Sequence, residues 1–144
     1  MADGLAVERC SRCGSDSVIH QAYSGQHFCG KHLSSSIRKR TSKELRQQLI
    51  LPKDARHGDG SPYRILVAIS GGKDSAVLLT MMVDILGRRR DVEMIAGCID
   101  EGIDGYRAPS LECARQLAES LDVRFETLSY EEMGYERMDE VVTR

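Results

Sequence analysis

The chain has 144 residues, of which 41% are hydrophobic and 29% charged, and its formal net charge is −2. This composition is typical of a globular protein and excludes a mainly disordered one, and the length suits one ordinary domain with a small appendage. The longest uncharged apolar stretch, residues 76–83, is far shorter than the roughly 20 residues that span a bilayer, so we expect no membrane partner.

The first residues and the cysteines together indicate the compartment. Residues 1–8 lack the basic and apolar segments of a secretory signal, so we expect a cytoplasmic protein. Five cysteines in such a protein favour metal binding or chemistry over a disulfide framework. Charge is divided unevenly, because residues 1–57 carry ten Lys and Arg against five Asp and Glu, and residues 58–144 carry ten against seventeen. A basic arm on an acidic body indicates a polyanionic partner for the arm.

The first motif has the spacing of a structural zinc site. Cys10 and Cys13 are separated by two residues, and so are Cys29 and His32, with fifteen residues between the pairs. Each pair would place two ligands on one side of a tight turn, and four protein ligands leave no position for a catalytic water. The alternative is three chance thiols and a histidine. The spacing predicts a zinc knuckle that stabilises a module too small to fold on its core alone.

A basic helix is predicted after the knuckle. Leu33, Ile37, Leu45 and Leu49 recur at helical spacing, and a capping box at residues 41–44 would restart a second helix there. Two interpretations of the Lys and Arg residues between these apolar positions remain open: they contact RNA phosphates, or they form an ordinary solvated helix face. The candidate RNA-binding residues are Arg38, Lys39, Arg40, Lys43 and Arg46.

Residues 52–62 have the Pro, Gly, Asp and Ser composition of a linker, and the domain boundary is predicted there. A zinc-knuckle module with the basic helix would then occupy residues 1–51, and a second domain residues 63–144. Within that domain, Ile65 to Ile69 read as a short buried strand.

Ser70-Gly-Gly-Lys-Asp-Ser75 follows the strand and has the composition of a phosphate-binding loop. Its glycines let the backbone approach a ligand, and the N–H groups and dipole at the start of the next helix favour an anion. The Walker pattern fails, because it needs glycine where Val67 stands and Ser or Thr where Asp74 stands. The loop matches that of ATP pyrophosphatases; the alternative is a glycine turn that only closes a strand–helix unit.

The remaining elements complete a β-α-β-α-β-α order. We expect a helix that begins near Pro109, and before it a helix over 72–86 that buries Val77, Leu78, Met81, Met82, Ile85 and Leu86. Strands are predicted over 92–99 and 123–128, and a last helix from Met138. This order predicts an α/β fold with a doubly wound parallel sheet, whose carboxyl edge brings the loops at 70–75 and 100–107 together over one nucleotide. Cys98 is read as a core residue and Cys113 as a helix residue.

The zinc knuckle, the basic helix, the loop at 70–75 and the stretch Ile99-Asp-Glu-Gly-Ile-Asp-Gly-Tyr-Arg107, in this order, resemble the tRNA 2-thiouridine synthetases of the TtcA and TtuA type. These include the catalytic subunit of the cytoplasmic tRNA 2-thiolation complex. The resemblance implies an adenine nucleotide alpha-hydrolase-like fold of the PP-loop ATPase class. It also implies a sulfurtransferase that adenylates C2 of a wobble uridine with ATP, releases pyrophosphate, and then exchanges AMP for sulfur.

The resemblance also implies roles for residues of this chain. Lys73 and Asp74 would be catalytic, with Mg²⁺ held near Asp74 and zinc in the knuckle. Residues in contact with ATP would be Ala68, Ser70, Gly71, Gly72, Lys73, Asp74, Ser75, Ile99 and Gly102. Expected partners are tRNA and a ubiquitin-like sulfur carrier, with the protein a homodimer or a subunit of a complex.

Many family members hold an iron–sulfur cluster on three cysteines, two of which form a C-x-x-C pair downstream of the third strand, and this sequence reaches Arg144 before any such pair. We therefore expect a cluster only in a longer form, and we expect the present chain alone to be incomplete for sulfur transfer. Two alternatives remain. One is another PP-loop ATPase that adenylates a different substrate, and the other is a zinc-containing RNA-binding or scaffold module with residual nucleotide binding.

Overall fold

The computed structural model describes residues 7–143. Most of residues 1–8, where the sequence analysis expects no secretory signal, therefore lie outside the described residues. The chain divides into two compact units, Met1–Ile50 and Leu51–Arg144. No helix in the described part of the chain is long and apolar enough to cross a membrane.

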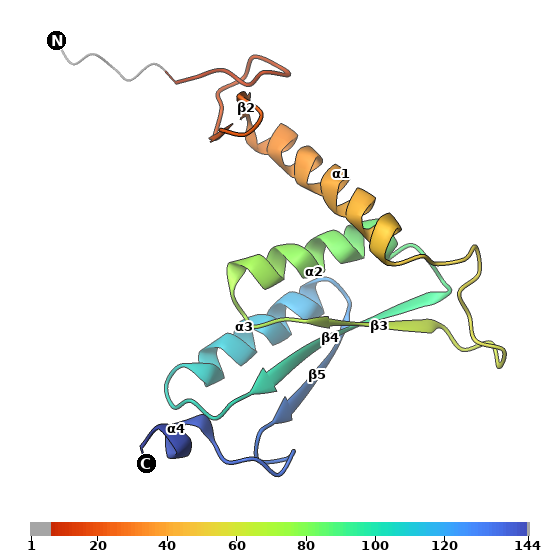
Figure 1. Cartoon of the computed structure of the whole chain (residues 1–144), viewed down its shortest axis with the longest axis vertical. Coiled ribbons are helices and arrows are strands. Elements are labelled where there is room, and N and C mark those ends of the chain that lie inside the picture. The colour runs from red at the N-terminus through yellow and green to blue at the C-terminus, as the bar shows by residue number, and fades with distance from the viewer. Residues whose placement is uncertain (1–6, 144) are drawn as a thin grey trace. The chain divides into compact units, whose positions relative to one another are not determined.

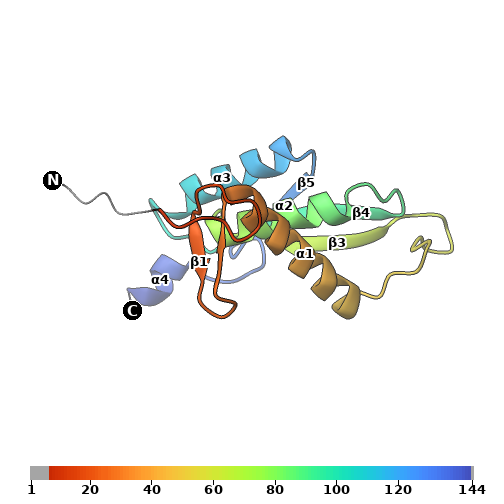
Figure 2. The ribbon, with the colours of Figure 1, turned by 90° about the horizontal axis from the view of Figure 1, so that it is seen from above.

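The first unit is a small hairpin followed by one long helix. Strands β1 (Ile19–Gln21) and β2 (Gln26–Phe28) pair antiparallel, and α1 (Gly30–Gln48) begins directly after Cys29 (Figure 1). Figure 2 shows β1 with the loop that joins it to β2. Phe28 is 1% exposed, whereas none of the residues of α1, all of which are described, is buried. This unit therefore has very little apolar core.

Helix α1 is continuous through the predicted capping box. The expectation of a second helix that restarts at residues 41–44 is wrong, because Gly30–Gln48 form a single helix of 19 residues. Most of its residues around this point, Arg, Lys, Glu, Leu and Gln, are good helix formers, so the backbone has little reason to break there.

The second unit is an α/β fold with a parallel three-stranded sheet, as the sequence predicts. The strand order is β3-β4-β5, and both pairs are parallel. Its elements are β3 (Tyr63–Ala68), α2 (Lys73–Leu86), β4 (Val92–Asp100), α3 (Arg107–Ser120), β5 (Arg124–Ser129) and α4 (Met138–Val142).

The core of the second unit lies between the sheet and its helices. Ala96 of β4 and Ala118 of α3 are fully buried, and Val67 of β3 is 4% exposed. On the other sheet face, Leu66 and Ile99 are 68% and 47% exposed. Successive right-handed crossovers in one direction place their helices on a single face, which explains this asymmetry.

The two helices differ from their predicted details. Helix α2 buries Met82 and Leu86, as predicted, and also Leu79, whereas Val77 and Leu78, which were expected inside, are 48% and 46% exposed. The three buried residues have the spacing i, i+3, i+7 of one helix face, and this face leaves out Val77 and Leu78. Helix α3 begins at Arg107 and carries Pro109 in its first turn, where a missing N–H costs no helical hydrogen bond.

A buried carboxylate connects the segment before β3 to the start of β4. Asp91 is 7% exposed, accepts a hydrogen bond from the Ala55 N–H at 2.7 Å and pairs with Arg89 at 2.5 Å. Arg89 also donates to the Pro52 carbonyl at 2.7 Å. The Arg89 hydrogen bond, followed by that of Ala55, holds the pKa of Asp91 well below its usual range. The segment at 52–55 is thus fastened to the body of its own unit.

Candidate metal and nucleotide sites

Four potential metal ligands converge in the first unit. The ligand atoms of Cys10, Cys13, Cys29 and His32 all lie within 4.8 Å of one another. The Cys13 and Cys29 sulfurs are 3.7 Å apart, and His32 Nδ1 lies 3.4 Å from the sulfurs of both Cys10 and Cys29. Turns at the hairpin base and the first turn of α1 bring the two sequence pairs together. The arrangement can hold one metal ion.

The pKa values of the Cys10 and Cys29 thiols are shifted in opposite directions. Burial raises the pKa of the Cys10 thiol, but hydrogen bonds outweigh that effect and lower it to about 5. For Cys29, the hydrogen bond from the His32 backbone lowers the pKa, yet burial and the neighbouring thiols outweigh it and raise the value. A metal ligand must be the thiolate, so Cys10 is prepared for binding at neutral pH.

The loop at 70–75 joins the carboxyl end of β3 to the start of α2. Gly72 is the residue before the first helical turn, and Asp74 is the acidic residue within that turn. Gly71 has φ of +86°, a left-handed conformation that favours glycine. The helix N-terminus therefore faces this loop with its positive dipole end, the geometry that suits a phosphate.

The two serines of the loop bond to the loop itself. The Ser75 hydroxyl accepts from the Ser70 N–H at 3.1 Å and donates to the Gly72 carbonyl at 3.1 Å. The Ser70 hydroxyl accepts from the Gly72 N–H at 3.2 Å. The predicted hydroxyl donors thus close the loop in this structure. Lys73 and Asp74, in contrast, have side chains that are 92% exposed, 3.7 Å from one another, and accessible to a ligand.

The other predicted nucleotide contacts lie on neighbouring strand ends. Ala68 pairs with Gly97, and the pairing continues as the Ile69 N–H donates to the Gly97 carbonyl at 2.8 Å. Ile99 is two residues further along β4, and Gly102 follows in the next loop with φ of +73°. The structure thus places both loops at one edge of the sheet.

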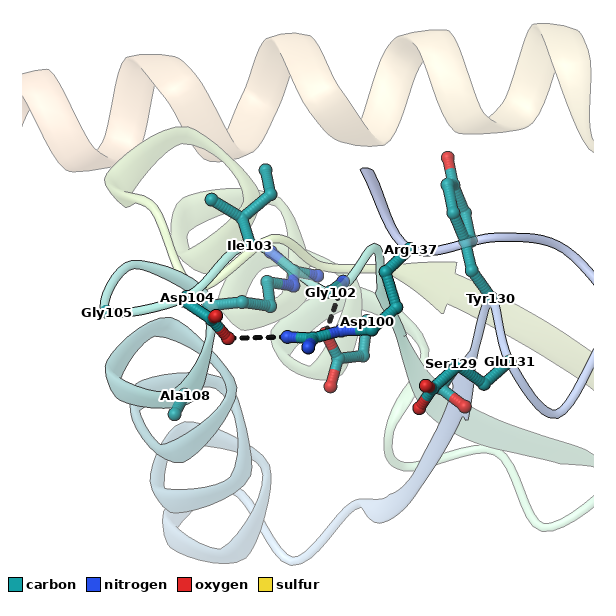
Figure 3. A pocket seen from close by; sticks show the side chains of 11 residues that line it. Asp100, Gly102, Ile103, Asp104, Gly105, Ala108, Ser129, Tyr130, Glu131 and Arg137 are labelled. Carbon is teal, nitrogen blue, oxygen red and sulfur yellow. Dashed lines mark hydrogen bonds and ion pairs between the residues drawn. The ribbon is translucent and has the colours of Figure 1, made fainter. Parts of the chain in front are cut away.

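Two pockets lie along this edge. One, of about 180 Å³, lies between the loop at 70–75 and α3, where Cys113 lines it. The other, of about 190 Å³, lies beyond β4 and β5, and its lining includes Asp100, Tyr130 and Glu131 (Figure 3). Sequence reasoning missed the residue that touches both regions, Arg107, which lines the second pocket and donates to the Ser70 carbonyl.

Loops and helix ends shape the second pocket. The Asp100 carboxylate accepts from the Gly102 N–H at 2.9 Å, and Arg137 pairs with Asp104 at 2.5 Å, both marked in Figure 3. The backbone N–H of Asp104 also donates a hydrogen bond to the Asp139 carboxylate at 2.7 Å. These contacts join the loop after β4 to the segment that leads into α4.

The basic residues of α1 are all exposed, and one has a defined aromatic partner. Arg40 donates to the Tyr23 hydroxyl, and its guanidinium lies 5.2 Å from the centre of that ring. Lys39 and Lys43 are exposed on the same helix. Of the unassigned thiols, Cys98 is a core residue at 4% exposure, in agreement with the prediction, and Cys113 is exposed on α3.

Comparisons with known proteins place these features in a family. The profile of the amino-terminal LIM domain of the 2-thiouridine synthetase TtuA matches residues 9–34, which contain the four metal ligands. The chain is 41% identical over 135 residues to the tRNA 2-thiolation protein NcsA of Haloferax volcanii, an alignment that covers 94% of this chain and 41% of that protein. It is 30% identical over 142 residues to cytoplasmic tRNA 2-thiolation protein 1 of Drosophila grimshawi, with 97% and 39% covered.

A solved structure shares the fold. The U34-tRNA thiolase NcsA from Methanococcus maripaludis, determined with its [4Fe-4S] cluster, superposes with a TM-score of 0.72 and 24% identity, covering 96% of this chain and 43% of that one. The chain spans about two fifths of the length of the curated relatives it matches. On the motif order, the matched amino-terminal domain and the alignments over nearly its whole length, the chain belongs to the TtuA- and NcsA-type family of tRNA 2-thiolation proteins.

Proposed function

We propose that this chain supplies the ATP-binding and metal-binding part of an ATP-dependent tRNA 2-thiolation enzyme. The observation that carries the proposal is the Ser70–Ser75 loop at the junction of β3 and α2, in a chain 41% identical to the Haloferax volcanii protein. A parallel-sheet edge with a glycine loop and a helix N-terminus suits a nucleoside triphosphate. The substrate would be a tRNA wobble uridine.

The chemistry begins with adenylation, because the oxygen on C2 of uridine is a poor leaving group. That oxygen attacks the α-phosphate of ATP, a new P–O bond forms, and the bond to the β-phosphate breaks to release pyrophosphate. A sulfur nucleophile then attacks C2 and displaces AMP. Negative charge develops on the α-phosphate and the pyrophosphate, where the helix N-terminus and Lys73 would stabilise it. Mg²⁺ bound near Asp74 would neutralise further phosphate charge.

We assign zinc to the cluster in the first unit. A tetrahedral zinc with Zn–S bonds of about 2.3 Å and Zn–N bonds of about 2.0 Å separates two sulfurs by about 3.8 Å, and a sulfur from a nitrogen by about 3.5 Å. The separations of 3.7 Å and 3.4 Å within the cluster are close to these values. Four ligand atoms that converge on one point favour a single ion over an iron–sulfur cluster, whose cysteines bind different irons. The ion would stabilise the fold.

Substrate RNA would bind the basic helix, since all five candidate residues on α1 are exposed. The proposed organisation is a zinc module over 1–51, a linker over 52–62, and an ATP-pyrophosphatase domain over 63–144. A ubiquitin-like thiocarboxylate is the proposed sulfur source, and the cytoplasm the proposed location.

The experiment uses the protein that contains this chain, with unmodified tRNA, ATP, Mg²⁺ and sulfide. Mass spectrometry of the digested tRNA should detect 2-thiouridine at the wobble position, and Lys73→Ala should abolish it. A matched control, Lys53→Ala, removes an exposed lysine outside the loop and should retain activity. Thiolation that is as fast in Lys73→Ala as in the control would contradict the assigned role of the loop.

A further inference from the structure

Arg107, at the first position of α3, is an unusual residue because its charge is buried. Its side chain is 8% exposed, although arginine is rarely buried without full pairing. Burial of a guanidinium is costly unless acceptors surround it. Its position in the fold therefore depends on the contacts that its planar, forked donor group makes.

Those contacts reach three separate segments. One terminal nitrogen, Nη1, donates to the Ser70 carbonyl in the phosphate loop at 3.2 Å. The other, Nη2, donates to the Ile99 carbonyl near the end of β4 and lies 2.9 Å from the Cys98 sulfur. Nε lies 2.9 Å from a carboxylate oxygen of Glu101 in the loop after β4. A single residue thus joins the phosphate loop to the strand and loop beside it.

The backbone of the phosphate loop also lies directly against α3. A Cβ atom placed on Gly71 would be 2.2 Å from the Ser110 carbonyl oxygen and 2.8 Å from its carbon. Both are backbone atoms inside a helix, so they cannot move aside as a flexible side chain does. This close approach, observed independently of the arginine contacts, makes the first turn of α3 a rigid support behind the loop.

Arg107 determines which way the Ser70–Gly71 peptide faces. In a planar trans peptide, the C=O and the following N–H point in opposite directions. Because the Ser70 carbonyl points to Arg107, the Gly71 N–H points away from it. Loss of the arginine fork would free this peptide to rotate and would turn a carbonyl dipole toward the place where an anion would bind.

We propose that Arg107 is a positioning residue of the nucleotide site: it holds the Ser70–Gly71 peptide in the orientation that receives phosphate and couples this loop to the loop after β4. The proposal rests on the proposed function in one respect, namely that the loop binds ATP. Its structural half, the support of the loop, is testable without any nucleotide.

The first test is hydrogen exchange of the ligand-free protein, with Arg107→Lys as the variant. Lysine keeps the charge, but a single ammonium cannot reproduce a fork that reaches Ser70, Ile99 and Glu101. Amides of residues 70–72 should exchange about tenfold faster or more than in the parent, while those of β4 stay protected. Arg115→Lys is the control, because Arg115 lies on the same helix and, among the described residues, pairs only with exposed Glu112 and Glu119. Equal exchange in the two variants would overturn the proposal.

The second test compares the binding of ATP and adenosine to the same proteins. In Arg107→Lys the affinity for ATP should fall about tenfold or more relative to that for adenosine, since one correctly placed charge-assisted contact is of this size. An equal fall for both ligands, or a fall matched by Arg115→Lys, would reduce Arg107 to a general structural role. A parent protein that binds no ATP would instead refute the proposed function, and the exchange experiment would still decide the support of the loop.

Gly71→Ala approaches the same question from the loop and serves where Arg107→Lys fails to fold. The added methyl meets the Ser110 backbone and should displace the loop, with faster exchange at 70–72 and weaker ATP binding. Gly60→Ala is matched for backbone strain, because φ is +85° there and +86° at Gly71, but no atom of residues 7–143 lies within 4 Å of its Cβ position. Identical behaviour of the two alanine variants at residues 70–72 would contradict the proposed contact.

Discussion

The two units of this chain are stabilised in different ways. Among residues 7–50, only Cys10 and Phe28 are buried hydrophobic residues, whereas the described part of the second unit has ten. The first unit instead gathers four metal ligands within 4.8 Å. The first fold therefore depends on a few ligands at one point, and the second on many apolar contacts spread over a sheet and two helices.

Metal removal should produce the largest difference between the units. Chelation, or Cys10→Ser with Cys29→Ser, should unfold the β1–β2 hairpin, because structural zinc supplies about 10–16 kcal/mol of apparent folding free energy in zinc-finger peptides. Amide exchange should become fast over residues 19–28 and remain slow in β3 and β4. Cys113→Ser, which changes an exposed thiol outside the cluster, should have neither effect.

Metal analysis of the purified protein should give about one zinc per chain. Two results would contradict a metal-dependent first unit beside an independently stable second unit. One is a metal-free protein whose hairpin amides stay protected, and the other is concerted unfolding of both units on chelation.

Substitutions in the phosphate loop should have the next largest effects. They should weaken ligand binding with little effect on folding. Lys73→Ala removes an exposed cation and should weaken ATP binding by roughly 1.5–3 kcal/mol. Gly72→Val should weaken ATP binding at least as much; φ at Gly72 is −87°, and among the described residues only the Ser70 hydroxyl, at 3.3 Å, lies near its Cβ position. The Ser70 hydroxyl has to shift by a few tenths of an ångström to admit the added Cβ, and we expect the valine side chain to obstruct phosphate binding.

Isothermal titration with ATP measures these affinities, and thermal unfolding of the same samples measures stability. Lys53→Ala is the control for general charge effects. Unchanged ATP affinity in both loop variants would show that the loop has another role.

The buried Asp91 should make the second unit sensitive to acid. Its pKa is depressed by Arg89 and the Ala55 N–H, so the stabilisation is complete above the ordinary Asp value of about 4 and is lost as the pH falls below it. At pH 7, Asp91→Asn should lower the unfolding midpoint of the second unit, and the difference from the parent should shrink on acidification.

Asp59→Asn is the comparison variant, because the hydrogen bonds of Asp59 within the described part of the chain stay in its own turn, to Ser61. It should change the midpoint less than Asp91→Asn. A difference between parent and Asp91→Asn that is constant from pH 7 to pH 3 would contradict the role of the charge.

The smallest expected effect concerns the basic helix. If Lys39 and Lys43 contact tRNA phosphates, their replacement by Gln should make the slope of log affinity against log salt shallower by about 1.8 for duplex-like contacts. Arg88→Gln with Arg90→Gln removes two exposed cations from the other unit and serves as the control. An equal slope in all three proteins would mean that Lys39 and Lys43 are solvated side chains that do not contact tRNA phosphates.

Much of this architecture is predictable because its signals are local. The parallel sheet follows from alternating strands and helices, and the residues at 10, 13, 29 and 32 are recognisable by spacing alone. The family assignment, made from the order of the motifs, is confirmed by the comparisons.

What the sequence does not reveal depends on contacts between distant segments. Arg107 and the Ser70 carbonyl that it binds are 37 residues apart, and so are Arg89 and Pro52. In α2 the predicted burial of Met82 and Leu86 is confirmed, but Leu79 is buried in place of Val77 and Leu78, because the position of the sheet decides which helix face is buried. Arg107 ends one of the stretches that carry the family resemblance, but only the fold shows that its charge is buried.

The most direct test of the central claim is the fate of the ATP phosphates in the protein that contains this chain. With tRNA, Mg²⁺ and ATP labelled at the α-phosphate, cleavage should occur between the α- and β-phosphates. Labelled AMP and free pyrophosphate should appear together, and both should be lost in Lys73→Ala. Labelled ADP with inorganic phosphate would contradict the account, because it would mean attack at the γ-phosphate and a different reaction at this loop.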